Sequence, residues 1–416
     1  MHRGLFIPIL AMIIVFLDVY VYQAVRILIS RFSLWARRVA VSGYWAITAI
    51  TLTVIGVFAF LEDTFPNRVI RNIIVVWILI HILSKTLATV FVLADDLIRI
   101  VRFAGRKVLQ FTDKKVVIPG KPISRSEFLA KSAVIAGAIP AVTMGLGMLG
   151  GAYNFRLRKK TIFLPHLPSE FDGIRIGQLS DIHAGSFYSK SPIESGLNLL
   201  MEEKPDIIFF TGDLVNDHAK EVEPYMGLLK MVKAPLGVYS VLGNHDYGDY
   251  ESWPSAEAKR QNLQKLIAFE REIGWDLLMN ENRIIKVDGQ ALAVIGVENW
   301  GKGRFQKYGD LQKAYVNAGA PVKLLLSHDP SHWDAQVRPG YGDIDITFSG
   351  HTHGFQFGVE IGNFKWSPSQ YMYEQWAGLY QKGNQYIYVN RGFGFIGYPG
   401  RVGIWPEVAI IELKKG

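Results

Sequence analysis

Residues 206–213 have the sequence Asp206-Ile207-Ile208-Phe209-Phe210-Thr211-Gly212-Asp213, in which apolar residues stop at a glycine and a carboxylate. Such a short β-branched and aromatic run predicts a buried strand, and the glycine allows a sharp turn at its end. Four other apolar runs lead directly into residues of metal-ligand type: 173–180 into Asp181 and His183, 237–242 into Asn244, His245 and Asp246, 322–327 into His328, and 345–349 into His351 and His353. Helix-length amphipathic segments alternate with these runs, which is typical of an α/β fold.

The polar residues after the five runs are expected to converge. Ligands of open α/β sheets bind outside the carboxyl ends of the strands, so five such ends can meet in one crevice. Five of the ten histidines lie at these junctions, and the chain has no cysteine. One histidine beside a strand is as often a structural residue, but five with interleaved Asp and Asn predict a metal site without thiolate ligands.

These motifs, D-x-H, G-D, G-N-H-D, H and G-H-x-H, resemble in type and order those of the calcineurin-like metallophosphoesterase superfamily over about residues 161–416. The ending, 388–407, resembles its membrane-associated bacterial branch, and the whole chain resembles the transmembrane proteins with a metallophosphoesterase domain. The resemblance implies a two-sheet α/β sandwich flanked by helices. Phe355 departs from that branch, which has glycine there, and adds a ring beside the site.

The resemblance also implies a role for each motif residue. Asp213 would bridge two divalent ions; Asp181, His183 and His353 would complete one ion, and Asn244, His328 and His351 the other. Carboxylate, imidazole and amide ligands suit Mn, Fe, Co or Zn, and the sequence does not choose among them. A water activated by the ions is the expected nucleophile.

Three further roles concern the substrate. His245 is expected to protonate the leaving group, with the adjacent Asp246 orienting its imidazole by fixing its tautomer or raising its basicity; the alternative is that Asp246 simply begins the next loop. Arg391 is a weaker candidate for binding the substrate phosphate, because an arginine there is at least as well explained by pairing with a structural carboxylate. The aromatic-rich stretch 354–405 is explained mostly by packing, with a membrane-interface rim as the alternative.

The first part of the chain predicts a membrane region. Four apolar stretches are long enough to span a bilayer, which needs about 20 residues: Leu5–Ile29, Ser42–Leu61, Ile73–Ala94 and Ser132–Tyr153. We therefore expect a region of about four transmembrane helices over 1–155 and a metallophosphoesterase domain over 156–416. Asp18, His81 and Lys85 lie within the spans, where structural pairing or snorkelling is favoured over transport.

Charge separates the two parts and suggests a topology. Residues 1–160 carry 21 Lys and Arg against 7 Asp and Glu, whereas 161–416 carry 24 against 30. The basic charge thus belongs to the apolar part, which argues against nucleic-acid binding. Basic loops follow the first span and precede the fourth, and cytoplasmic loops are usually the basic ones. This pattern predicts an extracytoplasmic catalytic domain, although the basic cluster 156–160 argues the opposite.

Together these features predict a multi-pass cell-membrane hydrolase. Its expected substrate is a phosphate ester, either a phosphodiester or a pyrophosphate, and the family resemblance includes lipid-linked or nucleotide-sugar substrates such as UDP-diacylglucosamine. Besides this substrate and the bilayer, no partner is predicted. The alternative is a non-catalytic membrane sensor or scaffold that retains the fold, which degraded ligand motifs would favour; a transporter is a third class, against which the scarcity of ionisable residues in the spans counts.

Overall fold

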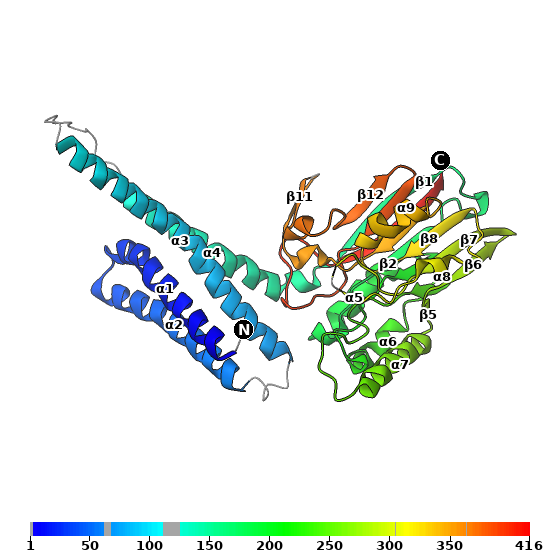
Figure 1. Ribbon diagram of the computed structural model, residues 1–416, viewed down its shortest axis with the longest axis horizontal. Coiled ribbons are helices and arrows are strands. Elements are labelled where there is room, and N and C mark those ends of the chain that lie inside the picture. Colours follow the sequence, from blue (N-terminus) through cyan, green and yellow to red (C-terminus); the bar gives the residue numbers. More distant parts are fainter. Residues whose placement is uncertain (1–2, 62–67, 111–124, 304, 363) are drawn as a thin grey trace. The chain divides into compact units, whose positions relative to one another are not determined.

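The computed structural model describes residues 3–61, 68–110, 125–303, 305–362 and 364–416 (Figure 1). The chain divides into two compact units, Met1–Leu146 and Gly147–Gly416. The boundary expected from the sequence, between residues 155 and 156, lies slightly later in the chain.

The first unit consists of long apolar helices. They are α1 (Arg3–Ile29), α2 (Leu34–Leu61), α3 (Arg68–Gln110) and α4 (Arg125–Leu149), the last of which continues into the second unit. Each is long and apolar enough to cross a membrane, which confirms the four predicted spans within the described residues. The connections 62–67 and 111–124, used above to predict topology, lie outside the described residues.

The helix ends differ from the predicted span ends. Helix α3 has 43 residues, which makes it roughly 65 Å long against a hydrocarbon core of about 30 Å. Charged residues such as Arg99 end the apolar stretch in the sequence but do not end the helix. Hydropathy therefore underestimates the length of the helix. Helix α4 ends at Leu149 and not at Tyr153, and a side chain at Gly151 would place its Cβ 2.0 Å from the Arg401 carbonyl oxygen.

A buried polar cluster joins three helices of the first unit. Asp18 on α1 lies 2.7 Å from the Lys85 ammonium and 3.0 Å from His81 Nε2, both on α3. Thr48 on α2 donates a hydrogen bond of 2.8 Å to the same carboxylate. A charge buried among membrane-spanning helices is tolerated only when it is paired. The structure thus agrees with the expectation that these three residues pair structurally.

The second unit contains two six-stranded sheets. The first sheet has the order β1 (Arg156–Leu164), β14 (Glu407–Lys415), β2 (Arg175–Leu179), β3 (Ile207–Phe210), β4 (Val238–Ser240), β5 (Asp276–Leu277). The second has the order β12 (Gly378–Lys382), β13 (Gln385–Val389), β9 (Ile346–Ser349), β8 (Val322–Leu326), β7 (Gln290–Gly296), β6 (Glu281–Val287). A separate hairpin is formed by β10 (Val359–Ile361) and β11 (Phe364–Trp366).

The two sheets pack face to face, with helices on both outer sides (Figure 1). The core between them includes Ile176 and Phe209 from one sheet and Leu324 and Phe348 from the other. Helices α5 (Lys190–Met201) and α7 (Ala256–Ile273) cover the outer side of the first sheet, and α8 (Leu311–Tyr315) and the turn Trp333–Val337 cover that of the second. The shorter helices are α6 (Met226–Leu229) and α9 (Arg338–Gly340). This architecture confirms the predicted two-sheet sandwich.

Parallel pairing brings the predicted ligand segments to one edge. Strands β2, β3 and β4 are parallel neighbours in the first sheet, and β8 and β9 are parallel neighbours in the second. The two sheets are joined at this edge by Gln178, whose side-chain amide donates to the Ser349 carbonyl at 3.0 Å. All five strand ends therefore face a common region, because parallel strands present their carboxyl ends on the same side.

Candidate metal centre

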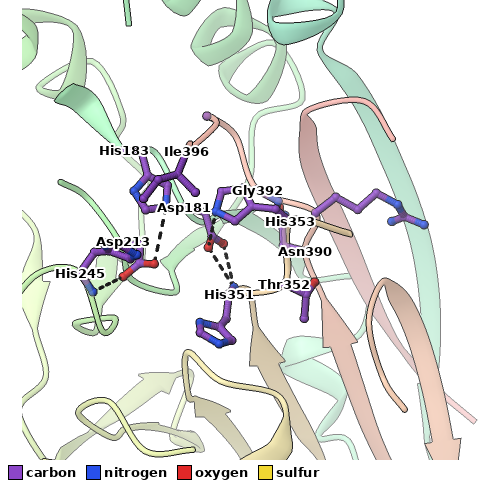
Figure 2. Close-up of polar contacts among 12 residues, drawn as sticks. Asp181, His183, Asp213, His245, His351, Thr352, His353, Asn390, Gly392 and Ile396 are labelled. Carbon is purple, nitrogen blue, oxygen red and sulfur yellow. Dashed lines mark hydrogen bonds and ion pairs between the residues drawn. The ribbon is translucent and has the colours of Figure 1, made fainter. Parts of the chain in front are cut away.

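The loops after β2 and β9 form one group of candidate metal ligands. Asp181, His183 and His353 are buried, and their potential donor atoms all lie within 4.8 Å of one another. His353 Nε2 lies 3.0 Å from His183 Nε2 and 3.2 Å from Asp181 Oδ1. Figure 2 shows these side chains directed toward each other. Two imidazole nitrogens and a carboxylate oxygen in this arrangement fit one divalent ion.

A second group comes from the loops after β3, β4, β8 and β9. It contains Asp213, His328 and His351, again with donor atoms within 4.8 Å of one another. His328 Nε2 lies 3.2 Å from His351 Nδ1 and 3.1 Å from the side-chain oxygen of Asn244. This donor set also fits a divalent ion, with the Asn244 amide oxygen as a further ligand.

One oxygen of Asp213 faces both groups. Its Oδ2 lies 3.6 Å from His183 Nε2 and 3.2 Å from His328 Nε2, whereas its Oδ1 accepts a hydrogen bond of 2.9 Å from the His245 backbone N–H. A carboxylate between two cation sites lowers the repulsion between the cations. All seven residues expected to bind metal are therefore brought together, with Asp213 at the centre.

The loops that carry these ligands have an unusual backbone conformation. Asp181, His183, Asp213, His351 and His353 all have a positive φ, between 49° and 70°. Residues other than glycine rarely adopt this conformation, and it is typical of functional sites held by the surrounding structure. At the preceding Gly350, a Cβ atom would lie 2.2 Å from Asp181 Oδ2, so a side chain there would displace a ligand.

The electrostatic environment favours cation binding by these side chains. Burial lowers the pKa of His183 to about 3 and that of His351 to about 4, which keeps both imidazoles neutral. Burial opposes charge on His328 also, but the Asp213 carboxylate outweighs it and raises the His328 pKa to about 10. Burial opposes ionisation of Asp213, yet the surrounding imidazoles hold its pKa well below the usual range. A metal ion would therefore compete with a proton at His328.

The carboxylate of Asp246 does not orient His245, which corrects that expectation. Its oxygens accept hydrogen bonds of 2.8 Å from the backbone N–H groups of Asp213, Leu214 and Gly243. His245 Nδ1 lies instead 2.8 Å from the Asn216 carbonyl oxygen. The Asp246 carboxylate therefore supports the turn that carries Asp213, and the Asn216 carbonyl is the partner of the His245 imidazole.

Known proteins share these features. Residues 174–355 match the model of the calcineurin-like phosphoesterase family. Residues 2–152 match the model described as the transmembrane domain of probable calcineurin-like phosphoesterases. Residues 174–355 are a calcineurin-like phosphoesterase domain. It is accordingly a metal-dependent phosphoric ester hydrolase with a transmembrane domain.

Two relatives illustrate this similarity. An uncharacterized metallophosphoesterase of Bacillus subtilis is 28% identical over 310 residues, which is 71% of this chain and 99% of the relative. A transmembrane protein with a metallophosphoesterase domain from Danio rerio is 28% identical over 321 residues, covering 71% of this chain and 68% of that protein. A solved sulfate thiohydrolase of Thermus thermophilus covers 60% of this chain and 57% of its own at 14% identity, with a TM-score of 0.33 that is too low for an argument.

A cavity of about 210 Å³ opens onto the metal centre of this phosphoesterase. His245 lines it together with three residues that the sequence did not single out: Tyr250, Phe305 and Ile396. Two further supports of the site were also missed: the Tyr373 hydroxyl, 2.8 Å from His351 Nε2, and the Arg401 guanidinium, 3.2 Å from His353 Nδ1. Tyr373 carries no motif, and Arg401 belongs to the ending that resembles the bacterial branch. Neither position indicates a contact with the metal centre, because both side chains reach it only through the fold of the 354–405 segment.

Arg391 lies outside this cavity. Its guanidinium pairs with Glu407 at 2.6 Å and with Glu360 at 2.5 Å, and its side chain is 5% exposed. This geometry contradicts the prediction that Arg391 binds substrate phosphate at the metal centre and agrees with the alternative that it pairs with structural carboxylates. Two carboxylates already occupy the donors that a phosphate would need.

A buried acid behind the phosphoesterase site predicts a pH-dependent stability. Burial raises the pKa of Glu270 on α7 to about 8 from an ordinary value of 4.5, although the Ser240 hydroxyl donates to it. Folded protein then retains a proton that unfolded protein loses, so the free energy of unfolding should fall as pH rises from 4.5 to about 8, by up to about 1.4 kcal/mol per pH unit.

Glu270→Gln should remove this contribution. The thermal unfolding midpoint of the wild type should fall relative to that of the variant between pH 5 and pH 8, because only the wild type carries an acid that loses its stabilising proton as pH rises. Glu272→Gln is the matched control, since Glu272 on the same helix is 57% exposed. Parallel pH profiles for wild type and Glu270→Gln would contradict this prediction.

Proposed function

We propose that the chain is a membrane-tethered phosphoesterase that uses two divalent ions, with residues 156–416 as the catalytic domain and 1–155 as the membrane region. The observation that carries the proposal is the position of Asp213 Oδ2 between two sets of ligands. The donors are carboxylate, imidazole and amide, which suit Mn, Fe, Co or Zn. Two ions held by these residues would supply a nucleophilic water and charge stabilisation for phosphoryl transfer.

The protein side chains have distinct roles in this proposal. Asp181, His183 and His353 would hold one ion, Asn244, His328 and His351 would hold the other, and Asp213 would serve both. His245 donates a proton to the leaving oxygen, and Asp246 acts indirectly, by holding the backbone of the Asp213 turn. The hydrogen bond from His245 Nδ1–H to the Asn216 carbonyl leaves Nε2 as the nitrogen that transfers the proton.

The substrate we propose is a phosphodiester or a pyrophosphate, with a lipid-linked or nucleotide-sugar molecule such as UDP-diacylglucosamine as a specific candidate. The tether to a transmembrane region supports a substrate that resides in the bilayer. Tyr250, Phe305 and Ile396 support a group with apolar or ring character beside the phosphate, because they line the same cavity as His245. Phe355, 56% exposed, is a further difference from the related branch.

The function is tested by hydrolysis with the purified full chain. Protein stripped of metal and then supplied with Mn²⁺ or Zn²⁺ should release p-nitrophenol from bis-p-nitrophenyl phosphate, and p-nitrophenyl phosphate ranks monoester against diester activity. UDP-diacylglucosamine in mixed micelles tests the specific candidate. Two bound ions without turnover of any of these esters would favour the sensor or scaffold.

We also propose that the catalytic domain is extracytoplasmic, which the basic loop after α1 supports. Because the chain has no cysteine, a Ser252→Cys variant should react with an impermeant thiol reagent in intact cells. Ser252 is exposed. Ser30→Cys, in the exposed turn after α1, should react only after lysis. The reverse labelling pattern would place the domain in the cytoplasm.

A further inference from the structure

A second cavity lies away from the metal centre and has a strongly basic lining. Its volume is about 640 Å³. The basic residues are Arg156, Arg158 and Lys160 of β1, Lys365 of β11, and Arg391 after β13, and Glu360 is the only acidic residue in the lining. Residues i and i+2 of a strand share a face, so β1 directs a row of three cations to one side.

Carboxylates compensate only part of this charge. Arg158 pairs with Glu360, and Arg391 pairs with Glu360 and Glu407. Lys365 donates to the Ala377 carbonyl at 2.7 Å and to the Tyr380 hydroxyl at 2.9 Å, both of them neutral groups. Within the described part of the chain, Arg156 and Lys160 have exposed side chains and no carboxylate partner. Three cations thus remain to attract an anion.

The β10–β11 hairpin beside this cavity directs its charged side chains to the cavity and leaves apolar side chains exposed. In the register of β10 and β11, Glu360 pairs with Lys365, and both line the cavity. Ile361 pairs with Phe364 at the end of the hairpin, where Phe364 also borders the cavity. Ile361 is 73% exposed and Phe364 61% exposed, and Val359, on the same face as Ile361, is 40% exposed. A hairpin on a soluble domain normally buries its apolar face and exposes its charges.

The apolar exposure extends beyond the hairpin. Tyr371 and Met372, a few residues after β11, are 77% and 70% exposed. Other aromatic residues of the same stretch, such as Trp376 and Phe393, are buried, so only this part of it remains uncovered. Contiguous exposed apolar groups beside cations match an interface with an anionic bilayer, where apolar side chains enter the lipid and cations meet phosphates.

The chain itself keeps this region close to a bilayer. Helix α4 ends the fourth candidate span at Leu149, and β1 begins at Arg156. Seven residues can extend no more than roughly 25 Å. Arg156 therefore lies within reach of the headgroups that surround the end of the span.

We propose that the basic cavity binds the phosphate of an anionic phospholipid headgroup while the apolar face of the β10–β11 hairpin enters the bilayer interface. The ligand chemistry is a phosphate monoanion with an attached acyl chain, and soluble phosphate is the other source of the same group. This site is separate from the metal centre, so its test does not depend on hydrolysis. Failure of one proposal leaves the other unaffected.

The test uses the full chain in lipid nanodiscs, with an environment-sensitive fluorophore on Ile361→Cys. In phosphatidylcholine containing phosphatidylglycerol, the emission should shift to the blue and be quenched by spin-labelled lipid. Phosphatidylcholine alone should give a smaller change. Val316→Cys is the positional control, because Val316 is 58% exposed and belongs to another surface; its label should respond to neither lipid.

Charge removal tests the cavity. Arg156→Gln with Lys160→Gln should weaken association of the labelled hairpin with phosphatidylglycerol by about 30-fold, since each cation near an anionic surface contributes about fivefold. Arg260→Gln with Lys265→Gln removes the same charge from α7, where the two side chains are 62% and 50% exposed. Unchanged thermal unfolding midpoints establish that both double variants are folded.

Three results would overturn the proposal. They are a label at Ile361 that behaves like the label at Val316, an equal loss of association in the α7 control, and a full response to millimolar inorganic phosphate in neutral nanodiscs. The last result would assign the cavity to a soluble phosphate ligand. Loss of the response in the cavity variant alone supports the lipid headgroup.

Discussion

Replacing Asp213 with asparagine is expected to lower hydrolysis of bis-p-nitrophenyl phosphate by at least about 10³-fold, because losing the metal site removes several kcal/mol of transition-state stabilisation. One oxygen of Asp213 faces ligands of both sets, at 3.6 Å from His183 and 3.2 Å from His328. An amide carries no negative charge and can turn an NH₂ group toward those nitrogens. We therefore expect the loss of at least one divalent ion together with the activity.

Metal content and turnover should be measured on the same preparation. Elemental analysis gives ions per chain, and kcat/KM gives the loss of catalysis. Asp276→Asn is the matched control, because its carboxylate pairs with Arg283 on the surface and is 42% exposed. An Asp213→Asn protein that holds two ions and hydrolyses the diester at the wild-type rate would exclude a bridging role.

Replacing His245 with alanine is expected to leave the metal content unchanged and to lower turnover by about 10²–10⁴-fold for an alkyl leaving group, the usual range for general acid catalysis. His245 contacts the Asn216 carbonyl and lines the cavity, and it belongs to neither set of metal-ligand residues. A p-nitrophenolate leaving group needs no proton, so its release should slow by less than about tenfold.

The dependence on leaving group is the decisive readout. Two diesters that differ only in an alkyl or a p-nitrophenyl leaving group should be compared in the wild type and the variant. His218→Ala provides the same chemical change outside the cavity, at a side chain that packs edge-on against Trp253 and is 30% exposed. Equal losses on both esters would show that His245 does not act as the acid.

Much of the metal centre could be predicted because its ligands directly follow strands. Asp181, Asp213, Asn244, His328 and His351 each occupy the first residues after an apolar run, and parallel pairing alone brings such positions together. The four apolar helices could also be predicted, since hydropathy over about 20 residues is a local property. Their full lengths could not, because a helix does not end where a bilayer ends.

Residues without this local context were assigned wrongly or missed. Asp246 follows His245 in sequence, yet its carboxylate turns to the backbone N–H groups of the β3 loop. Arg391 follows β13, but its guanidinium turns to Glu360 and Glu407 in a different cavity. Sequence adjacency indicates where a backbone lies but not where a long or charged side chain finds its partner, which depends on segments distant in the chain.

Local patterns in the sequence were therefore enough to predict an α/β fold, the apolar helices and the residue types of the metal centre, because period, composition and motif order act over short stretches of chain. The two-sheet sandwich followed from the family resemblance. Only the tertiary structure decided that Asp213 faces both ligand sets, that Tyr373 and Arg401 support the centre, and that the β10–β11 hairpin exposes its apolar face beside a basic cavity. These features arise from contacts between residues far apart in sequence, whose pairing is set by the packing of the whole domain.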